Sequence, residues 1–281
     1  MVGTHTWRVR TLRLYLPLAF FLLLTLFPFY WMLVTSLKPN EELYNLRNNP
    51  LLVYHPTLAH YVGVLLQTNF LRWTVNTLLV AVVTSVLSLV LGAMAAYPLA
   101  RTRFPGAALV AVGIAATYLV PQTLLFIPMA DIINALGLSN SLLSLVVTYP
   151  TFLIPFCAWL LMGYFKSIPR ELEEAARIDG ASRFQAMVRV VLPLAVPGLL
   201  SAFIFAFTLS QNEFLYALIF LTKSEIRTVP VGAIAELIRG DVFFWGQLMA
   251  AAVLGSVPVA VIYSFFVEYY VAGLTAGAVK G

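Results

Sequence analysis

The chain has 281 residues, of which 61% are hydrophobic and only 10% are charged, and its formal net charge is +5. Soluble domains usually carry about 25% charged residues, so this composition excludes a protein with an ordinary solvated surface. The mean hydropathy of +0.90 indicates a protein that lies largely within a membrane.

Long uncharged stretches predict six transmembrane helices. A bilayer core needs about 20 apolar residues for each spanning helix. Helices satisfy their own backbone hydrogen bonds in lipid, and no segments of the alternating type found in barrels occur here. The predicted spans are roughly residues 14–37, 73–98, 106–129, 142–165, 197–221 and 245–268. We therefore predict an all-α membrane protein with a single transmembrane domain over residues 1–281.

The first span follows three arginines, Arg8, Arg10 and Arg13, in an arrangement that resembles a signal peptide. The apolar run is too long for a typical signal sequence, and no small-residue cleavage site follows it. We expect an uncleaved first span.

Spans two and three each contain a further candidate for lining a substrate pathway. These are Asn76 and Gln122, near the outer ends of the two spans. Pro121 and Pro128 are expected to kink span three, because each removes a backbone hydrogen bond. Such a kink either lines a cavity or is only a packing irregularity. Cys157 is expected to be a small apolar filler of span four.

The inner segment after span four covers residues 166–193 and is too long for a simple connection of roughly 2–8 residues. Ser167 is a candidate N-cap of a first helix, with Pro169 in its first turn. Gly180 can end that helix in a left-handed conformation, and Ser182 can cap a second helix. This helix-turn-helix either docks into the groove of a partner or rests on lipid headgroups.

Span five carries the most polar group within any predicted span, Gln211-Asn212-Glu213, followed by Tyr216. A central charge in a bilayer costs roughly 2.5–3.5 kcal/mol on insertion scales, so such residues are functional candidates. Asn212 and Tyr216 are four residues apart and would share one helix face. The group either lines a substrate pathway or locks helices together, within the chain or against a partner.

Basic residues predict the orientation, because they concentrate on the cytoplasmic side of membrane proteins. With the N-terminus inside, eleven of the 17 basic residues lie in inner segments. These eleven are Arg8, Arg10, Arg13, Arg101, Arg103, Lys166, Arg170, Arg177, Arg183, Arg189 and Lys280. We therefore expect both termini in the cytoplasm.

Neither a metal site nor a nucleotide site is predicted. The three histidines, His5, His55 and His60, show no metal-ligand spacing and are expected at the surface. The chain also has no G-x-x-x-x-G-K-[ST] loop to hold nucleotide phosphates.

Two segments resemble a known family. The inner segment contains a spaced pattern that resembles the EAA loop of permeases of ATP-binding-cassette (ABC) importers. The pattern consists of Glu174, Ala175, Ala176, Gly180, Val190, Leu192 and Pro193, with Val190 where the family more often has isoleucine. The last nine residues, 273–281, resemble the tail of MalG-type carbohydrate permeases.

The resemblance implies a type I importer permease that forms half of a translocation pathway and has no catalytic role of its own. A separate ATPase would bind ATP and Mg²⁺, and the EAA loop would dock into it. The implied coupling residues are Glu174, Ala175, Ala176, Gly180, Leu192 and Pro193. The implied tail contacts with the ATPase are Gly273, Leu274, Thr275, Gly277, Ala278 and Lys280. The candidate pathway residues are Asn212, Glu213, Tyr216, Gln122 and Asn76.

The implied partners are a second homologous permease, two ATPase subunits and an extracytoplasmic sugar-binding protein, in a bacterial or archaeal cytoplasmic membrane. Three alternatives remain open from the sequence. In the first, the solute is a polyol, glycerol phosphate or an amino acid instead of a sugar. In the second, the chain is an ion-coupled transporter, for which Glu213 is nearly the only intramembrane charge. In the third, the chain is a membrane scaffold without transport.

Overall fold

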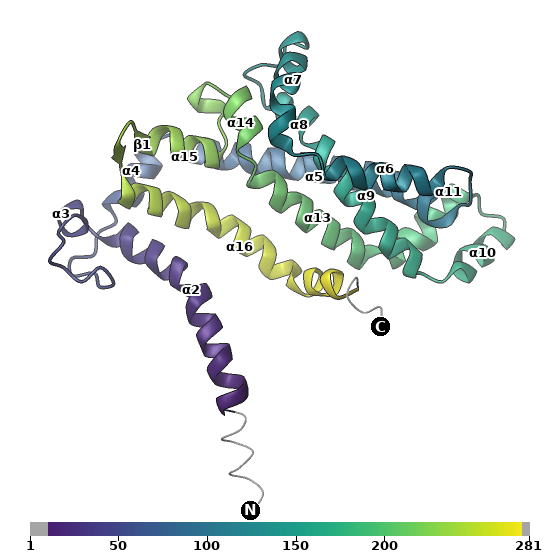
Figure 1. Ribbon diagram of the computed structural model, residues 1–281, viewed down its shortest axis with the longest axis horizontal. Helices are drawn as coiled ribbons and strands as arrows, with labels where there is room; N and C mark the ends of the chain where they lie inside the picture. The colour runs from purple at the N-terminus through teal and green to yellow at the C-terminus, as the bar shows by residue number, and fades with distance from the viewer. Residues whose placement is uncertain (1–10, 277–281) are drawn as a thin grey trace, which may run out of the picture. The chain divides into compact units, whose positions relative to one another are not determined.

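The computed structural model describes residues 11–276, with side chains described over residues 13–267. Helices dominate the described chain (Figure 1). The chain divides into two compact units. Unit one combines the chain up to Phe70 with Ala233–Pro258, and unit two combines Leu71–Gly232 with the chain from Val259 onward.

The elements in chain order are a π-helical turn Thr11–Tyr15, α2 (Leu16–Leu37), α3 (Asn40–Leu43), α4 (Ala59–Gln67), α5 (Phe70–Arg101), α6 (Ala107–Tyr118), α7 (Gln122–Ala135), α8 (Leu142–Thr148), α9 (Pro150–Ser167), α10 (Arg170–Ile178), α11 (Arg183–Ala186), a π-helical turn Met187–Val191, α12 (Leu192–Leu194), α13 (Val196–Gln211), α14 (Leu215–Phe220), a 3₁₀ turn Ser224–Ile226, α15 (Val229–Leu237), β1 (Ile238–Arg239), β2 (Val242–Phe243) and α16 (Trp245–Ala276).

Four stretches of the described chain are long and apolar enough to cross a membrane as helices. They are Arg13–Leu37, Phe70–Arg101, Leu142–Ser167 and Trp245–Val267. Two further pairs pass the same test together but bend sharply, by 91° between α6 and α7 and by 78° between the α11–α12 segment and α13. The structure therefore contains four to six candidate spans and confirms the predicted all-α membrane class.

The predicted third span is not one continuous helix. α6 ends at Tyr118 and α7 begins at Gln122, after Pro121 in an extended conformation (φ −60°, ψ 125°). Proline disfavours a helical conformation of the residue before it and donates no backbone hydrogen bond, so the helix breaks here. Pro128 lies inside α7.

The predicted fifth span is also interrupted. α13 ends at Gln211 and α14 begins at Leu215. Asn212 and Tyr216 therefore do not lie on one continuous helix, and the prediction that they share a helix face is wrong.

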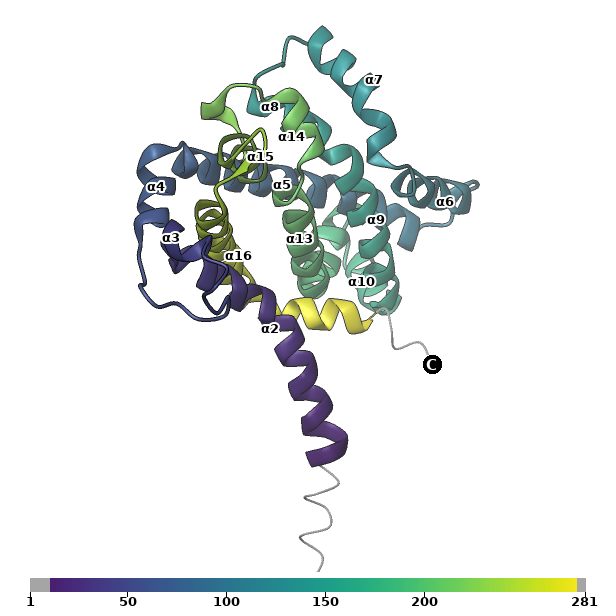
Figure 2. The ribbon, with the colours of Figure 1, turned by 60° about the vertical axis from the view of Figure 1, so that its left-hand side comes forward.

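Three helices, α5, α9 and α13, form the centre of unit two, where α9 and α13 run side by side in Figures 1 and 2. A Cβ atom on Gly92 of α5 would lie 2.7 Å from the Cβ of Cys157 on α9, so these helices approach as closely as a glycine allows. The hydroxyls of Thr84 on α5 and Ser210 on α13 are buried and 2.8 Å apart. Small residues and hydroxyl pairs of this kind are typical of helix contacts in membranes.

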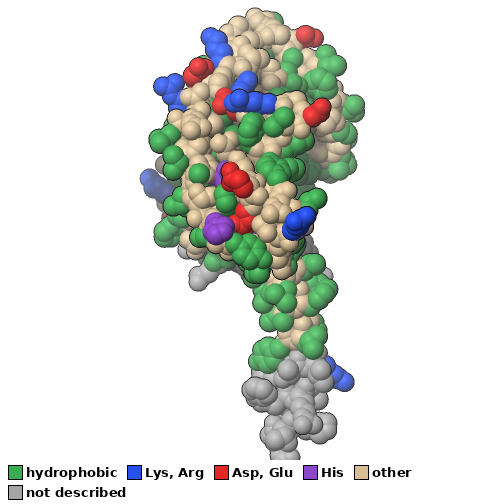
Figure 3. Space-filling model, turned by 90° about the vertical axis from the view of Figure 1, so that its left-hand side faces the viewer, with side chains coloured by type: hydrophobic (Ala, Val, Ile, Leu, Met, Phe, Trp, Pro, Cys, Tyr) green, Lys and Arg blue, Asp and Glu red, His purple; other side chains and the backbone are tan. Residues whose placement is uncertain are grey.

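In unit one, α2 exposes apolar side chains all around its axis. Every side chain from Arg13 to Trp31 is exposed, and Leu23 is 72% exposed. Figure 3 shows apolar side chains along this helix. A helix that is apolar on every face is suited to lipid or to another apolar helix.

The segment that follows α2 is held together by two charged residues. The buried Lys38 donates through Nζ to the carbonyl of Pro50 at 2.7 Å. The carboxylate of Glu42 accepts from the backbone N–H groups of Tyr54 at 2.9 Å and His55 at 3.0 Å. Burial alone would raise the pKa of Glu42, but these hydrogen bonds and the nearby Lys38 lower it below its ordinary value.

His60 differs from its predicted surface position. Its ring is buried, and Nε2 lies 2.8 Å from the carbonyl oxygen of Lys38. The start of α4 packs the ring against Gly246 of α16, where a Cβ atom would clash with it. His55 is exposed, as predicted, and His5 lies outside the described residues.

Candidate functional site

The inner segment predicted as an EAA loop forms two short helices, α10 and α11. α10 begins after Pro169, whose extended conformation places it at the N-cap. Ser167 does not cap this helix, because α9 continues through it and its hydroxyl donates to the carbonyl of Tyr164 at 2.7 Å. The predicted cap at Ser167 is therefore wrong, while the predicted first helix is present.

Gly180 ends α10 in the left-handed conformation that the sequence predicts, with φ +95°. The N–H of Ala181 donates to the carbonyl of Ala176 at 3.0 Å, and the N–H of Gly180 donates to the carbonyl of Arg177 at 3.1 Å. These two bonds form a Schellman motif, which satisfies carbonyls at the end of a helix. The turn thus fixes the direction in which the chain leaves α10.

Ser182 caps α11, as predicted. Its hydroxyl accepts from the N–H of Gln185 at 3.2 Å, and the side chain of Gln185 accepts from the N–H of Ser182 at 2.8 Å. This reciprocal pair is a capping box. The chain then continues through α12, which contains Leu192 and Pro193, to the 78° bend into α13.

The outer surface of α10 and α11 combines charged and apolar groups. Glu174, Ala175 and Gly180 are exposed. Three large apolar side chains on the same segment are also exposed: Leu172 (45%), Ile178 (86%) and Phe184 (66%). An exposed surface that mixes apolar and charged side chains suits contact with another protein.

The last turn of α5 holds α10 from the other side. Glu173 accepts a hydrogen bond from the hydroxyl of Tyr97 at 2.5 Å and forms an ion pair with Arg101 at 3.4 Å. Arg101 also donates through Nη1 to the carbonyl of Ile168 at 2.8 Å, and the carbonyl oxygen of Arg183 lies 3.3 Å from the Tyr97 hydroxyl. No sequence pattern predicts this cluster, although Arg101 is one of the basic residues expected on the inner side.

Glu213 lies in the break between α13 and α14 and is buried. Its carboxylate accepts from the hydroxyl of Tyr149 at 2.7 Å and from the backbone N–H groups of Tyr216 at 2.8 Å and Ala217 at 3.1 Å. A carboxylate at the first turn of a helix satisfies free N–H groups and complements the helix dipole. The geometry favours helix locking by Glu213 over contact with a substrate.

The other candidate pathway residues are placed separately. Tyr216 is buried, and its hydroxyl lies 3.4 Å from the carbonyl of Gln122. Asn212 is exposed, and its amide donates to the carbonyl of Thr208 at 2.9 Å. Asn76 donates to the carbonyls of Glu225 and Arg227, at 3.0 and 2.9 Å. The structure thus brings Glu213, Tyr216 and Gln122 together around α14. Asn76 lies elsewhere, against the backbone of Glu225 and Arg227.

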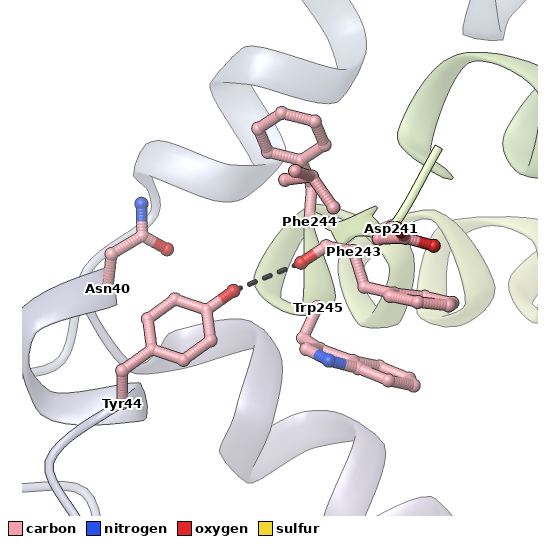
Figure 4. Close-up of a pocket in the computed structure, with 7 residues that line it drawn as sticks. Asn40, Tyr44, Asp241, Phe243, Phe244 and Trp245 are labelled. Atoms are coloured by element: carbon pink, nitrogen blue, oxygen red, sulfur yellow. Dashed lines mark hydrogen bonds between the residues drawn. The ribbon is translucent and has the colours of Figure 1, made fainter. Parts of the chain in front are cut away.

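Unit one contains an open hollow that the sequence did not predict (Figure 4). Its volume is about 450 Å³, and it is lined by Asn40, Tyr44, Asp241, Val242, Phe243, Phe244 and Trp245. Tyr44 donates to the carbonyl of Phe243 at 3.0 Å, and the rings of Phe243 and Trp245 stack 5.2 Å apart. Because these aromatic residues precede or begin the apolar helix α16, they match the aromatic belt at a membrane interface.

Comparison with known proteins identifies the family. Residues 88–275 match the family described as binding-protein-dependent transport system inner membrane component. The chain belongs to this family. Its members supply the membrane part of a binding-protein-dependent transport system, so this chain is a membrane permease component, as the EAA pattern predicted.

Individual relatives of this permease are similar over nearly their whole length. The inner membrane ABC transporter permease protein YcjP of Escherichia coli is 38% identical over 100% of both chains. The sulfoquinovosyl glycerol transport system permease protein SmoH of Agrobacterium fabrum is 39% identical, covering 91% of this chain and 89% of SmoH. The trehalose/maltose permease protein MalG of Thermococcus litoralis is 35% identical, covering 92% and 93%.

A solved structure shares the fold of this permease. A chain of a bacterial ABC transporter involved in the import of the acidic polysaccharide alginate superposes with a TM-score of 0.80, covering 96% of this chain and 99% of that chain. The two sequences are 23% identical, so this likeness shows the type I importer permease fold.

The predicted tail contacts all lie outside the residues whose side chains the structure describes. Gly273, Leu274 and Thr275 belong to the end of α16, which continues past the predicted span to Ala276. Gly277, Ala278 and Lys280 lie outside the described residues. Contact between this tail and an ATPase stays a prediction.

Proposed function

We propose that this permease forms one half of the translocation pathway of an ATP-driven carbohydrate importer. Relatives named for trehalose and maltose, sulfoquinovosyl glycerol, diacetylchitobiose and trehalose support a carbohydrate, because each name specifies a sugar or a sugar conjugate. A second, homologous permease completes the pathway, two ATPase subunits bind ATP and Mg²⁺, and an extracytoplasmic binding protein delivers the sugar.

The observation that carries the proposal is the surface of α10 and α11. Ile178 is 86% exposed and Phe184 is 66% exposed on a segment that also carries exposed charged side chains. Burial of such side chains in a partner groove would stabilise a complex by roughly 1.5–3 kcal/mol for each large apolar side chain. Glu174, Ala175 and Gly180 lie on the same exposed segment, and the small residues allow close approach of a partner backbone.

The charge distribution supports a cytoplasmic position for this surface, with both termini on the same side. Eleven of the 17 basic residues fall on that side. In this arrangement, ATP binding closes the ATPase subunits, and the docked α10 moves with them. The pathway then changes from inward-facing to outward-facing.

The apolar surface of α2 supports a second permease or lipid as its neighbour, since an exposed apolar helix is unfavourable in water. Among the candidate pathway residues, Asn212 at the end of α13 is exposed, Asn76 and Gln122 are partly buried, and Glu213 and Tyr216 are buried. The sugar itself is expected to be selected largely by the binding protein and the second permease.

Purification of the tagged chain in mild detergent tests the proposal, with mass spectrometry of the proteins that accompany it. We expect an ATPase and a second permease. Ile178→Glu is expected to reduce the recovered ATPase, because it places a charge at the docking surface. Leu46→Glu is the matched control, because Leu46 is fully exposed in the outer segment. Recovery of the chain without an ATPase would refute the proposal.

The substrate class is tested in sealed vesicles by competition for uptake. Carbohydrates are expected to compete, while a polyol, glycerol phosphate or an amino acid is not. Uptake without ATP would indicate an ion-coupled transporter.

A further inference from the structure

We propose that Tyr97, Arg101 and Glu173 form a positioning cluster that transmits the movement of the ATPase-docking helix α10 to α5. The inference rests on the proposed function, because it assumes that an ATPase moves α10. These three residues would pass the movement to the membrane helices, and none of them belongs to the EAA pattern.

The cluster uses the one acidic side chain of α10 that points inward. Glu171 and Glu174 are exposed, whereas the side chain of Glu173 is 12% exposed and its partner Arg101 is 2% exposed. A buried charge is strongly unfavourable without a partner, so Arg101 and Glu173 each require the other to remain where they are. The adjacent Glu174 is exposed, so the two neighbouring glutamates point to different sides of α10.

The last turn of α5 contacts the inner segment at three places. Arg101 binds the carbonyl of Ile168 just before α10, and its Nε lies 3.4 Å from Glu173 within α10. The hydroxyl of Tyr97 lies 2.5 Å from Glu173 and 3.3 Å from the carbonyl oxygen of Arg183, which begins α11. Force applied to α10 therefore reaches α5 through points before, within and after the docking helix.

Arginine is required at the centre of this arrangement. The guanidinium group presents several N–H donors in a fixed fork, so Arg101 can hold Ile168 and Glu173 at the same time. A lysine is a single point charge and cannot reproduce both contacts in the same geometry. Lysine at position 101 would keep the charge and lose the link to the carbonyl.

α5 then carries the movement to the rest of unit two. At its middle, the buried Thr84 hydroxyl lies 2.8 Å from that of Ser210 on α13. Ser210 lies one residue before the end of α13 at Gln211, close to the interruption where Glu213 accepts a hydrogen bond from the N–H of Tyr216 in α14. α5 therefore contacts the docking helix near its C-terminal end and the segment before the helix break near its middle.

Hydrogen–deuterium exchange of the complex, purified through a tag on this chain, tests the inference. Exchange is compared with and without Mg-ATP and vanadate, and the readout is the protection of the last turns of α5. ATP is expected to change this protection in the wild type. Glu173→Gln and Arg101→Gln are each expected to reduce the ATP-dependent change about tenfold, within the usual range of coupling between sites.

Three further variants distinguish a loss of transmitted movement from a general loss of stability. Glu171→Gln, an exposed glutamate of the same helix, is expected to retain the response. Tyr97→Phe removes only a hydroxyl, keeps the ring against Phe165, and is expected to weaken the response without lowering the thermal stability of the complex. The Arg101→Gln/Glu173→Gln double variant is expected to lose no more than either single variant, because both break one interaction.

The outcomes distinguish the cluster from the proposed function. If the ATPase accompanies every variant and α5 still responds to ATP, the cluster is not the link, and the proposed function stands. If the response falls only in variants of lower thermal stability, and Tyr97→Phe keeps it, the cluster has only a structural role. If no ATPase accompanies the wild type, both proposals fail.

Discussion

Replacement of Glu213 by alanine is the perturbation that best separates a structural role from a transport role for the polar group of the fifth span. The carboxylate accepts three hydrogen bonds, from Tyr149, Tyr216 and Ala217. Glu213 and Tyr149 are buried, so the substitution leaves donors that water reaches poorly.

The expected loss follows from these three donors. A buried donor without a partner costs roughly 1–3 kcal/mol, so three of them give a loss of about 3 kcal/mol at the lower limit. In a domain of 150–250 residues, 1 kcal/mol corresponds to roughly 2–4 °C in Tm, so we expect a decrease of about 6–12 °C. Glu213→Gln keeps one acceptor oxygen and is expected to lose less.

Thermal unfolding of the purified complex in detergent, followed by size-exclusion chromatography after heating, measures this decrease. Glu225→Ala is the control, because Glu225 is an exposed acid in the turn before α15, and the Tm of this variant is expected to change little. Tyr149→Phe removes one of the three donors without creating an unpaired group and is expected to have a smaller effect than Glu213→Ala.

A Glu213→Ala protein with wild-type Tm and abolished uptake would refute the reasoning. That result would show that the carboxylate acts on the substrate or on a coupled ion, and that the hydrogen bonds around it contribute little to stability.

Three other predictions follow from single positions. Gly198→Val should lower the Tm of the complex in the same heating assay, by roughly 1–3 kcal/mol of stability, because its Cβ would overlap the ring of Tyr164; an unchanged Tm would contradict this close packing. Gly180→Val should reduce ATP-driven uptake more than Gly180→Asn does, because φ is +95° and no atom lies near its Cβ, so only backbone strain acts; equal uptake by the two variants would exclude strain as the cause. The lowered pKa of Glu42 means that its stabilisation is present above its ordinary value of 4.5 and is lost as the pH falls. Proteolysis of the segment between α2 and α4 should therefore increase on acidification in the wild type and depend less on pH in Glu42→Gln.

The sequence predicted those parts of the structure that depend on local rules. Gly180 and Ser182 end and begin helices as predicted, because a left-handed turn and a side-chain cap need only nearby residues. Long apolar stretches identified α2, α5 and α16 for the same reason. The long apolar stretches alone were therefore enough to predict the fold class.

The sequence did not predict features that depend on distant residues. The interruption at Asn212 is stabilised by Tyr149, which is 64 positions away from Glu213 in the chain. In the sequence, Glu173 resembles any acidic residue in the first turn of a helix. Its partner Tyr97 lies 76 positions earlier in the chain, on α5. Periodicity within one helix carries no information about such partners, so the prediction of span five as one continuous helix is wrong.

Cross-linking from the docking surface tests the central claim most directly. The chain has one cysteine, Cys157, which is buried, so Ile178→Cys introduces an accessible thiol on α10. A short thiol-to-amine cross-linker is applied to native membranes, and the adduct is identified by mass spectrometry. The account predicts an adduct with an ATPase subunit that changes in yield with ATP, and none from Leu46→Cys in the outer segment. An Ile178→Cys protein that forms no adduct with an ATPase, while uptake remains normal, would contradict it.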